Sequence, residues 1–207
     1  MLRLPATVRS RHGLTVEGAG AALLEELLDA YRYEIERRDR RAWDGFRPGH
    51  SRHEIVDKFA EVGLVPPEEL VVWWAWSDGH PMMGPRGQRN TPFGIDHALR
   101  LYREDRDDAF ELLPGPEWVR IAGQGRRETI ALSCEAGVDL PLVRFLDIEQ
   151  GLGPQRLSDP YVMSLCTPVT WWLMGLAKGW IAFNRSRDRW TYKLEDAPIE
   201  WHLTQLL

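Results

Sequence analysis

The sequence predicts an α+β fold in which an antiparallel sheet of at least three strands packs with helices before and after it. Apolar residues recur at helical spacing in the first half of the chain, and one helix there, within residues 63–79, is apolar on nearly every side. Three short segments between residues 118 and 148 alternate apolar and polar residues, as strands do. A second strongly apolar helix is expected from about Thr167 to Gly179.

The first 45 residues are predicted to form an N-terminal leader and an extra amphipathic helix, separate from a domain over residues 46–207. Residues 1–20 contain Pro and Gly without a sustained period, so a loose or partly ordered leader is expected there. Leucines recur at helical spacing from Ala21 to about Trp43. This helix ends in the basic run RRDRR, residues 37–41, which is either a solvated last turn or a binding patch.

Two helices joined by a short Gly-Pro turn follow. Ser51 is the expected N-cap of the first, over Ser51–Val62, with Glu54 as its capping-box partner. The second lies within residues 63–79, where prolines and glutamates mark the start and Gly79 suits a left-handed C-terminal residue. Because this helix is so apolar, we expect it to be the buried centre of the fold, with any binding at its Asp78 end and in the loop beyond.

The loop over residues 80–92 is rich in Gly, Pro and Arg, and its length makes it a candidate functional segment. A helix capped by Asp96 is expected next, ended by Pro114. Its predicted buried stripe consists of Leu99, Tyr102, Ala109, Phe110 and Leu113.

The predicted strands are Trp118–Ala122, Thr129–Cys134 and Leu142–Ile148. The glycines in GQGRR between the first two resemble a phosphate-binding loop, but such a loop leads from a strand into a helix, so a hairpin turn is expected. A helix with Thr167 as N-cap follows. The chain then passes through the basic segment RSRDRW, interpreted as a solvated connection, to a short C-terminal helix ending at Leu207.

Composition indicates a globular protein with 43% apolar and 28% charged residues. The net charge of -5 argues against direct nucleic-acid binding and favours a basic protein partner. Cys134 and Cys166 lack disulfide-framework or metal-ligand spacing and are expected to be reduced and packed. The N-terminus lacks a signal-peptide pattern and the longest apolar run is about half a membrane span, so we expect a cytoplasmic protein without a membrane partner.

Residues that carry chemistry occur only as fragments. His50, His53, Glu54 and Asp57 are of metal-ligating types, but they spread around the first turn and a half of a helix, so a capped helix start is expected instead. GxSxG, Walker, HExxH and CxxC patterns are absent from the sequence. We therefore expect no enzyme, no cofactor and no metal; an enzyme with an unrecognised site is the remaining alternative.

The densest acidic run is a candidate surface for a basic partner, because charge complementarity speeds association. A merely solvated helix face is the alternative. The candidate partner-binding residues are Asp78, His80, Glu104, Asp105, Asp107, Asp108 and Glu111.

The segment FRPGHSRHEIVDKFAEVGLVPPEELVVWWAWSDGH, residues 46–80, resembles the opening of the SMI1/KNR4 (SUKH) superfamily. That pattern has a Pro-Gly start, a short helix with a buried Ile, a Glu-Leu pair, an aromatic helix and a terminal Asn-Gly or Asp-Gly. The strands WVRIA, TIALSC and LVRFLDI and the helix from Pro168 resemble later parts, so the resemblance covers roughly residues 46–179. Departures are Arg127-Glu128, where the family often has Gly-Asp, and the helix over residues 21–43, which has no clear counterpart.

The resemblance implies non-enzymatic binding. Bacterial members are largely immunity proteins that neutralise toxins, many of them nucleases or deaminases, and fungal relatives act in cell-wall regulation. The first expectation is therefore an immunity protein that neutralises a cognate bacterial toxin domain by direct binding. The alternative is a regulatory or scaffolding protein that binds an endogenous cytoplasmic partner. Both rest on analogy, since fold does not fix function.

Overall fold

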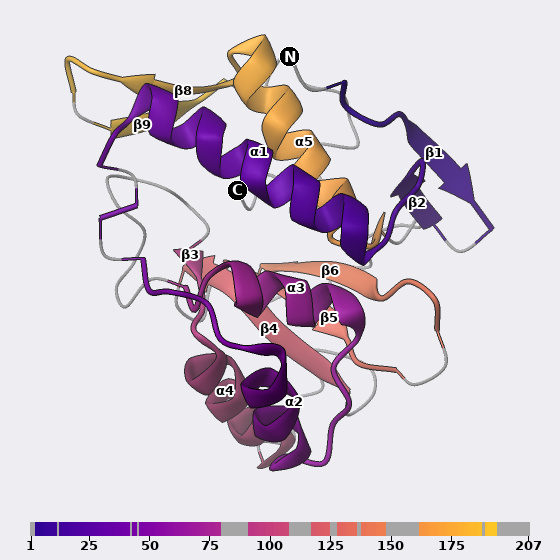
Figure 1. The fold of residues 1–207 in the computed structure, drawn as a ribbon. Helices are drawn as coiled ribbons and strands as arrows, with labels where there is room; N and C mark the ends of the chain where they lie inside the picture. Colours follow the sequence, from indigo (N-terminus) through magenta and orange to yellow (C-terminus); the bar gives the residue numbers. More distant parts are fainter. Residues whose placement is uncertain are drawn as a thin grey trace.

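The computed structural model describes residues 3–11, 13–41, 43–44, 46–79, 91–107, 117–124, 128–135, 138–147, 162–187 and 189–193. Its helices are α1 (Ala21–Arg38), α2 (Arg52–Ala60), α3 (Glu68–Trp76), α4 (Ile95–Asp107) and α5 (Cys166–Lys178). Its strands are β1 (Thr7–Ser10), β2 (Gly13–Val16), β3 (Thr91–Pro92), β4 (Trp118–Gln124), β5 (Glu128–Ser133), β6 (Leu142–Asp147), β7 (Val162–Met163), β8 (Ile181–Asn184) and β9 (Arg189–Tyr192). Helices and sheet together confirm the α+β class (Figure 1).

Within the described residues, the main sheet has seven strands in the order β1-β2-β7-β6-β5-β4-β3. The meander β4-β5-β6 is antiparallel, as the alternating segments predict. β2 runs parallel to β7, however, with Leu14 opposite Val162. The prediction of an antiparallel sheet is therefore right for the meander and wrong for the whole sheet, which is mixed. The parallel pair joins segments far apart in the chain, which local alternation cannot reveal.

The residues before α1 form the antiparallel hairpin β1–β2, with Thr7 opposite Val16. Of the two expectations for the leader, loose or partly ordered, the hairpin fits the second. Strands of four residues are too short for a visible period, but Leu14 and Val16 are buried in the main hydrophobic cluster. Trp171 of α5 also donates a hydrogen bond to the Thr7 hydroxyl over 3.1 Å. The division into residues 1–45 and 46–207 stays a prediction.

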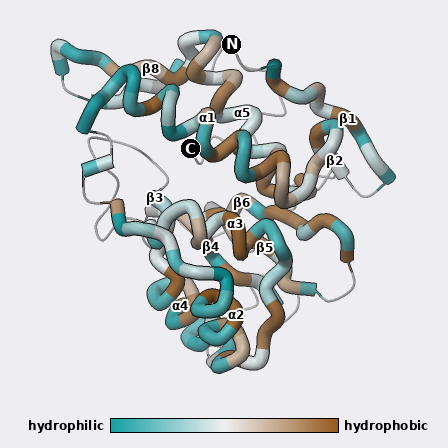
Figure 2. The backbone as a smooth tube through the Cα atoms, in the orientation of Figure 1, coloured by the Kyte–Doolittle hydropathy of each residue, from teal (hydrophilic) through white to brown (hydrophobic). Residues whose placement is uncertain are grey.

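Helix α3 lies at the centre of the fold, as its apolar sequence predicts. Figure 1 shows α1 and α5 packed together on one side of α3, with α2, α4 and the meander on the other. Trp73 and Trp74 are 2% and 0% exposed, and the Trp74 indole donates to the Phe93 carbonyl over 3.1 Å. In Figure 2, hydrophobic and hydrophilic residues alternate along α1 and α4, as expected for helices with one buried side.

The helix ends follow the predictions in part. The Ser51 and Glu54 capping box at the start of α2 is confirmed. α5 begins at Cys166, so Thr167 lies inside its first turn and donates to the Met163 carbonyl instead of capping the helix. β8 and β9 form a second, two-stranded sheet, which corrects the interpretation of residues 185–190 as a plain connection.

Parts of some predicted elements lie outside the described residues. These are Ala109, Phe110 and Leu113 of the buried stripe and the C-terminal helix ending at Leu207. Of the helices that the structure describes, none is both long and apolar enough to cross a membrane.

Candidate functional site

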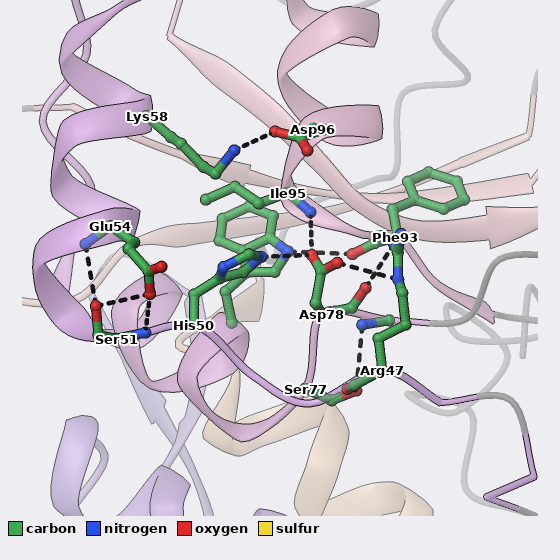
Figure 3. Close-up of polar contacts among 12 residues, drawn as sticks. Arg47, His50, Ser51, Glu54, Lys58, Ser77, Asp78, Phe93, Ile95 and Asp96 are labelled. Carbon is green, nitrogen blue, oxygen red and sulfur yellow. Dashed lines mark hydrogen bonds and ion pairs between the residues drawn. The ribbon is translucent and has the colours of Figure 1, made fainter.

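Three segments meet around Asp78 in what we call the Asp78 junction (Figure 3). They are residues 47–50 before α2, residues 77–79 after α3, and the first turn of α4. The backbone N–H of Arg47 donates to the Gly79 carbonyl over 3.0 Å, and the Asp78 N–H donates to the Arg47 carbonyl over 3.3 Å. This pairing fixes the start of α2 against the end of α3.

The Asp78 carboxylate is the centre of the junction. Its Oδ1 accepts a hydrogen bond of 2.8 Å from the backbone N–H of Ile95, the first residue of α4. Arg47 Nε lies 3.0 Å from Oδ2, and His50 Nε2 lies 3.1 Å from Oδ1. Asp78 therefore caps α4 from a distant part of the chain. The predicted cap, Asp96, instead pairs with Lys58 of α2, so that prediction is wrong.

Two glycines allow the junction to close. A Cβ on Gly49 would lie 1.8 Å from the Ala75 carbonyl oxygen, and a Cβ on Gly79 would lie 2.4 Å from that of Pro92. Gly79 also has a φ of 72°, in the left-handed region predicted for it. The Ser77 hydroxyl donates to the Arg47 carbonyl and accepts from the Gly79 N–H, each over 3.1 Å. Gly49 and Gly79 are therefore needed because the backbone segments of the junction pack closely together.

Of the candidate partner-binding residues, the structure describes the side chains of Asp78, Glu104 and Asp105, and Asp78 and Glu104 lie apart. Asp78 is 8% exposed and its carboxylate is used inside the junction. Glu104 is half-exposed on α4, where it pairs with Arg100 over 2.5 Å, about 14 Å along the helix from Ile95. His80, Asp108 and Glu111 lie outside the described residues; Asp107 ends α4, but its side chain does not belong to the described part.

Asp105 has a partner that the sequence did not reveal. Its carboxylate accepts a hydrogen bond of 2.6 Å from Arg120 of β4, whose side chain is only 5% exposed. Since a buried guanidinium needs a compensating charge, this pair holds α4 on the sheet. Arginines also accompany the acids on α4: Arg103 lies 3.9 Å from Glu61, and Arg106 lies over the Tyr102 ring. The described part of α4 is therefore mixed in charge.

Sequence reasoning also missed the role of Glu69 on α3, which is 2% exposed. Its carboxylate accepts hydrogen bonds of 2.6 Å from the Ser164 hydroxyl and from the Leu165 N–H, just before α5. Ser164 has a φ of 63°, in a region that non-glycine residues rarely adopt. Burial raises the pKa of Glu69, although the two hydrogen bonds oppose that change. Its spacing of four residues from buried Trp73 was the available sequence signal.

The raised pKa of Glu69 gives a testable pH dependence. Below its ordinary pKa of 4.5 the carboxyl is protonated in both the folded and the unfolded chain. As pH rises above that value the unfolded chain ionises first, so the contribution of Glu69 to stability falls as pH rises through the raised pKa. We expect the free energy of unfolding of the wild type, relative to Glu69→Gln, to decrease between pH 4 and pH 7 in urea titrations.

The neighbouring Glu68 is a control of opposite sign. It is exposed, and the hydrogen bond from Arg52 lowers its pKa. The wild type should therefore gain stability relative to Glu68→Gln as pH rises. If the free energy of unfolding of Glu69→Gln differed from that of the wild type by the same amount at every pH, the account of Glu69 would be contradicted.

Metal and thiol chemistry have little basis in the described residues. Within them, no group of three or more His, Cys, Asp or Glu side chains is placed to hold a metal ion. His50 faces Asp78, while His53 pairs with Asp57 over 3.2 Å. Cys134 and Cys166 are free and buried, as predicted, and burial raises the pKa of Cys134 to about 12. That thiol is protonated and unreactive at neutral pH.

The chain matches no protein-family model, and it has no match among curated proteins.

Proposed function

We propose that this chain is a non-enzymatic binding protein, an immunity protein that neutralises a cognate bacterial toxin domain by direct binding. The observation that carries the proposal is that four residues of the segment on which the SUKH resemblance rests have contacts that require their type. Gly49 and Gly79 leave no room for a side chain, and Ile55 is fully buried. Glu69 fixes the residues before α5. These contacts give the motif residues a structural role, which supports the resemblance on which the proposal rests.

The order of elements gives further support. After the Pro-Gly start come the short helix α2, the aromatic helix α3, the meander β4-β5-β6 and the late helix α5. This is the order that the resemblance implies. The motif residues are needed to hold the fold together. In this proposal the partner is therefore recognised by exposed side chains elsewhere on the same elements.

The direct test is growth rescue by co-expression with the toxin-like product of the neighbouring gene. We expect cells that express both proteins to grow and cells that express the toxin domain alone to stop growing. The variant Gly79→Ala has a destabilised fold and should protect the cells less well. Full toxicity in the presence of the wild-type chain would contradict the proposal, and a gene without a toxin neighbour would favour a regulatory role with an endogenous partner.

The finer part of the proposal assigns partner contact to the acidic residues of α4. Glu104→Lys should slow association with the toxin domain severalfold at low salt and much less at high salt, because exposed charges act mainly by steering. Glu36→Lys on α1 is a matched control. Glu36 forms an i,i+4 pair with Arg32 at 43% side-chain exposure, against 40% for Glu104 paired with Arg100. Equal rates for both variants, measured by stopped flow, would remove α4 from the interface.

A further inference from the structure

Two basic segments of the chain meet at one cavity, away from the Asp78 junction. The C-terminal end of α1 and the turn between β8 and β9 lie side by side (Figure 1). They enclose a cavity of about 440 Å³. The described residues that line it are Arg37, Arg38, Asp39, Arg40, Arg41, Phe183 and Arg185. The basic segments RRDRR (residues 37–41) and RSRDRW (residues 185–190) each look like a solvated end when taken separately. In the fold they contribute to one site.

Among the described residues, arginines outnumber carboxylates at the cavity. Glu34 pairs with both Arg37 and Arg38, and Asp39 is the one acid among the described residues of the lining. Burial raises the pKa of Glu34, but the hydrogen bonds from Arg38 and Arg37 outweigh burial and lower it, so this carboxylate stays ionised. Among the described residues, the cavity is thus lined by five arginines and Asp39, with Glu34 paired to two of the arginines, in a chain whose net charge is -5.

A solvated helix end accounts for only part of this arrangement. Arg37 and Arg38 suit the C-terminus of α1, where the helix dipole favours cations, and Arg38 donates to the Leu176 carbonyl over 3.0 Å. Arg40 and Arg185 lie outside any helix, are exposed and have no ion pair among the described residues. Holding such cations around a common space costs electrostatic repulsion, which a bound anion relieves.

We infer that this cavity binds a phosphate-bearing small molecule of about nucleotide size. Guanidinium groups present paired N–H donors that match phosphate oxygens, and the excess of cations favours a ligand with more than one negative charge. The volume lies in the range of small-molecule sites. Phe183 adds an apolar wall and packs against Trp190 with ring centroids 5.5 Å apart. The inference stands independently of toxin binding.

The test is calorimetric titration of the full chain with sodium pyrophosphate and with ADP at low salt and neutral pH. We expect both probes to bind the wild type, and the double variant Arg40→Gln/Arg185→Gln to bind at least about tenfold more weakly, because two charge-assisted donors are lost. The control Arg9→Gln/Arg187→Gln removes the same charge from exposed arginines outside the cavity lining and should bind as the wild type does.

A second double variant, Arg40→Lys/Arg185→Lys, keeps the charge and the fold but loses the paired donors, so binding intermediate between wild type and the Gln variant is expected. Three results would overturn the inference. They are no binding by the wild type at about 1 mM probe, equal weakening by the control, or tighter binding of a glutamate-rich peptide than of pyrophosphate at the same arginines.

Discussion

Replacing Gly79 by alanine is expected to lower the free energy of unfolding by about 2 to 5 kcal/mol. Its φ of 72° costs an L-residue roughly 1–2 kcal/mol. The added Cβ would also lie 2.4 Å from the Pro92 oxygen and 2.6 Å from the Phe93 carbonyl carbon. Both are backbone atoms that form the approach to α4, so neither can move aside without breaking the Asp78 junction.

Gly63 separates the two contributions. Its φ is 75°, nearly that of Gly79, but a Cβ there would meet nothing within 4 Å. Gly63→Ala should therefore cost only the conformational strain of about 1 kcal/mol. Urea unfolding of the two variants measures the difference. Equal losses would mean that the close approach of Gly79 to residues 92–94 does not exist.

Replacing Asp105 by alanine is expected to cost about 3 kcal/mol, because it leaves the buried guanidinium of Arg120 without a counter-charge. The matched variant Glu104→Ala breaks a neighbouring but exposed pair with Arg100, and it should change stability by no more than about 0.5 kcal/mol. Chemical denaturation at low and high salt measures both effects.

The double variant Asp105→Ala/Arg120→Met tests the cause. If the loss comes from an unpaired buried charge, then replacing the guanidinium with an apolar side chain of similar length should recover most of it. A double variant as unstable as Asp105→Ala alone would show that the loss comes from packing instead.

Local features of the fold were predictable because their causes lie within a few residues. The capping box of Ser51 and Glu54 joins groups three positions apart. The left-handed Gly79 follows from the residues that end α3, and the burial of Trp73 and Trp74 follows from the lack of a polar side on that helix. Antiparallel pairing of neighbouring strands was predictable for the same reason.

Features that depend on distant segments were not predictable. The cap of α4 comes from Asp78 rather than from Asp96, and the residues before α5 are held by Glu69. In the sequence, Asp105 is one of several acids expected to be solvated. In the structure it forms an ion pair with the buried Arg120. The basic cavity has the same origin, because residues 37–41 and Arg185 come together only through the packing of α1 beside β8. Sequence spacing can suggest that a residue such as Glu69 is buried, but it does not identify the distant partner.

Direct binding to a toxin domain is the central proposal, and a titration of the purified chain with a candidate toxin domain, chosen from the genes beside its own, tests it most directly. The account predicts a one-to-one complex at micromolar concentrations and loss of the toxin domain's activity as the complex forms. No complex at micromolar concentrations, with both proteins folded, would contradict it.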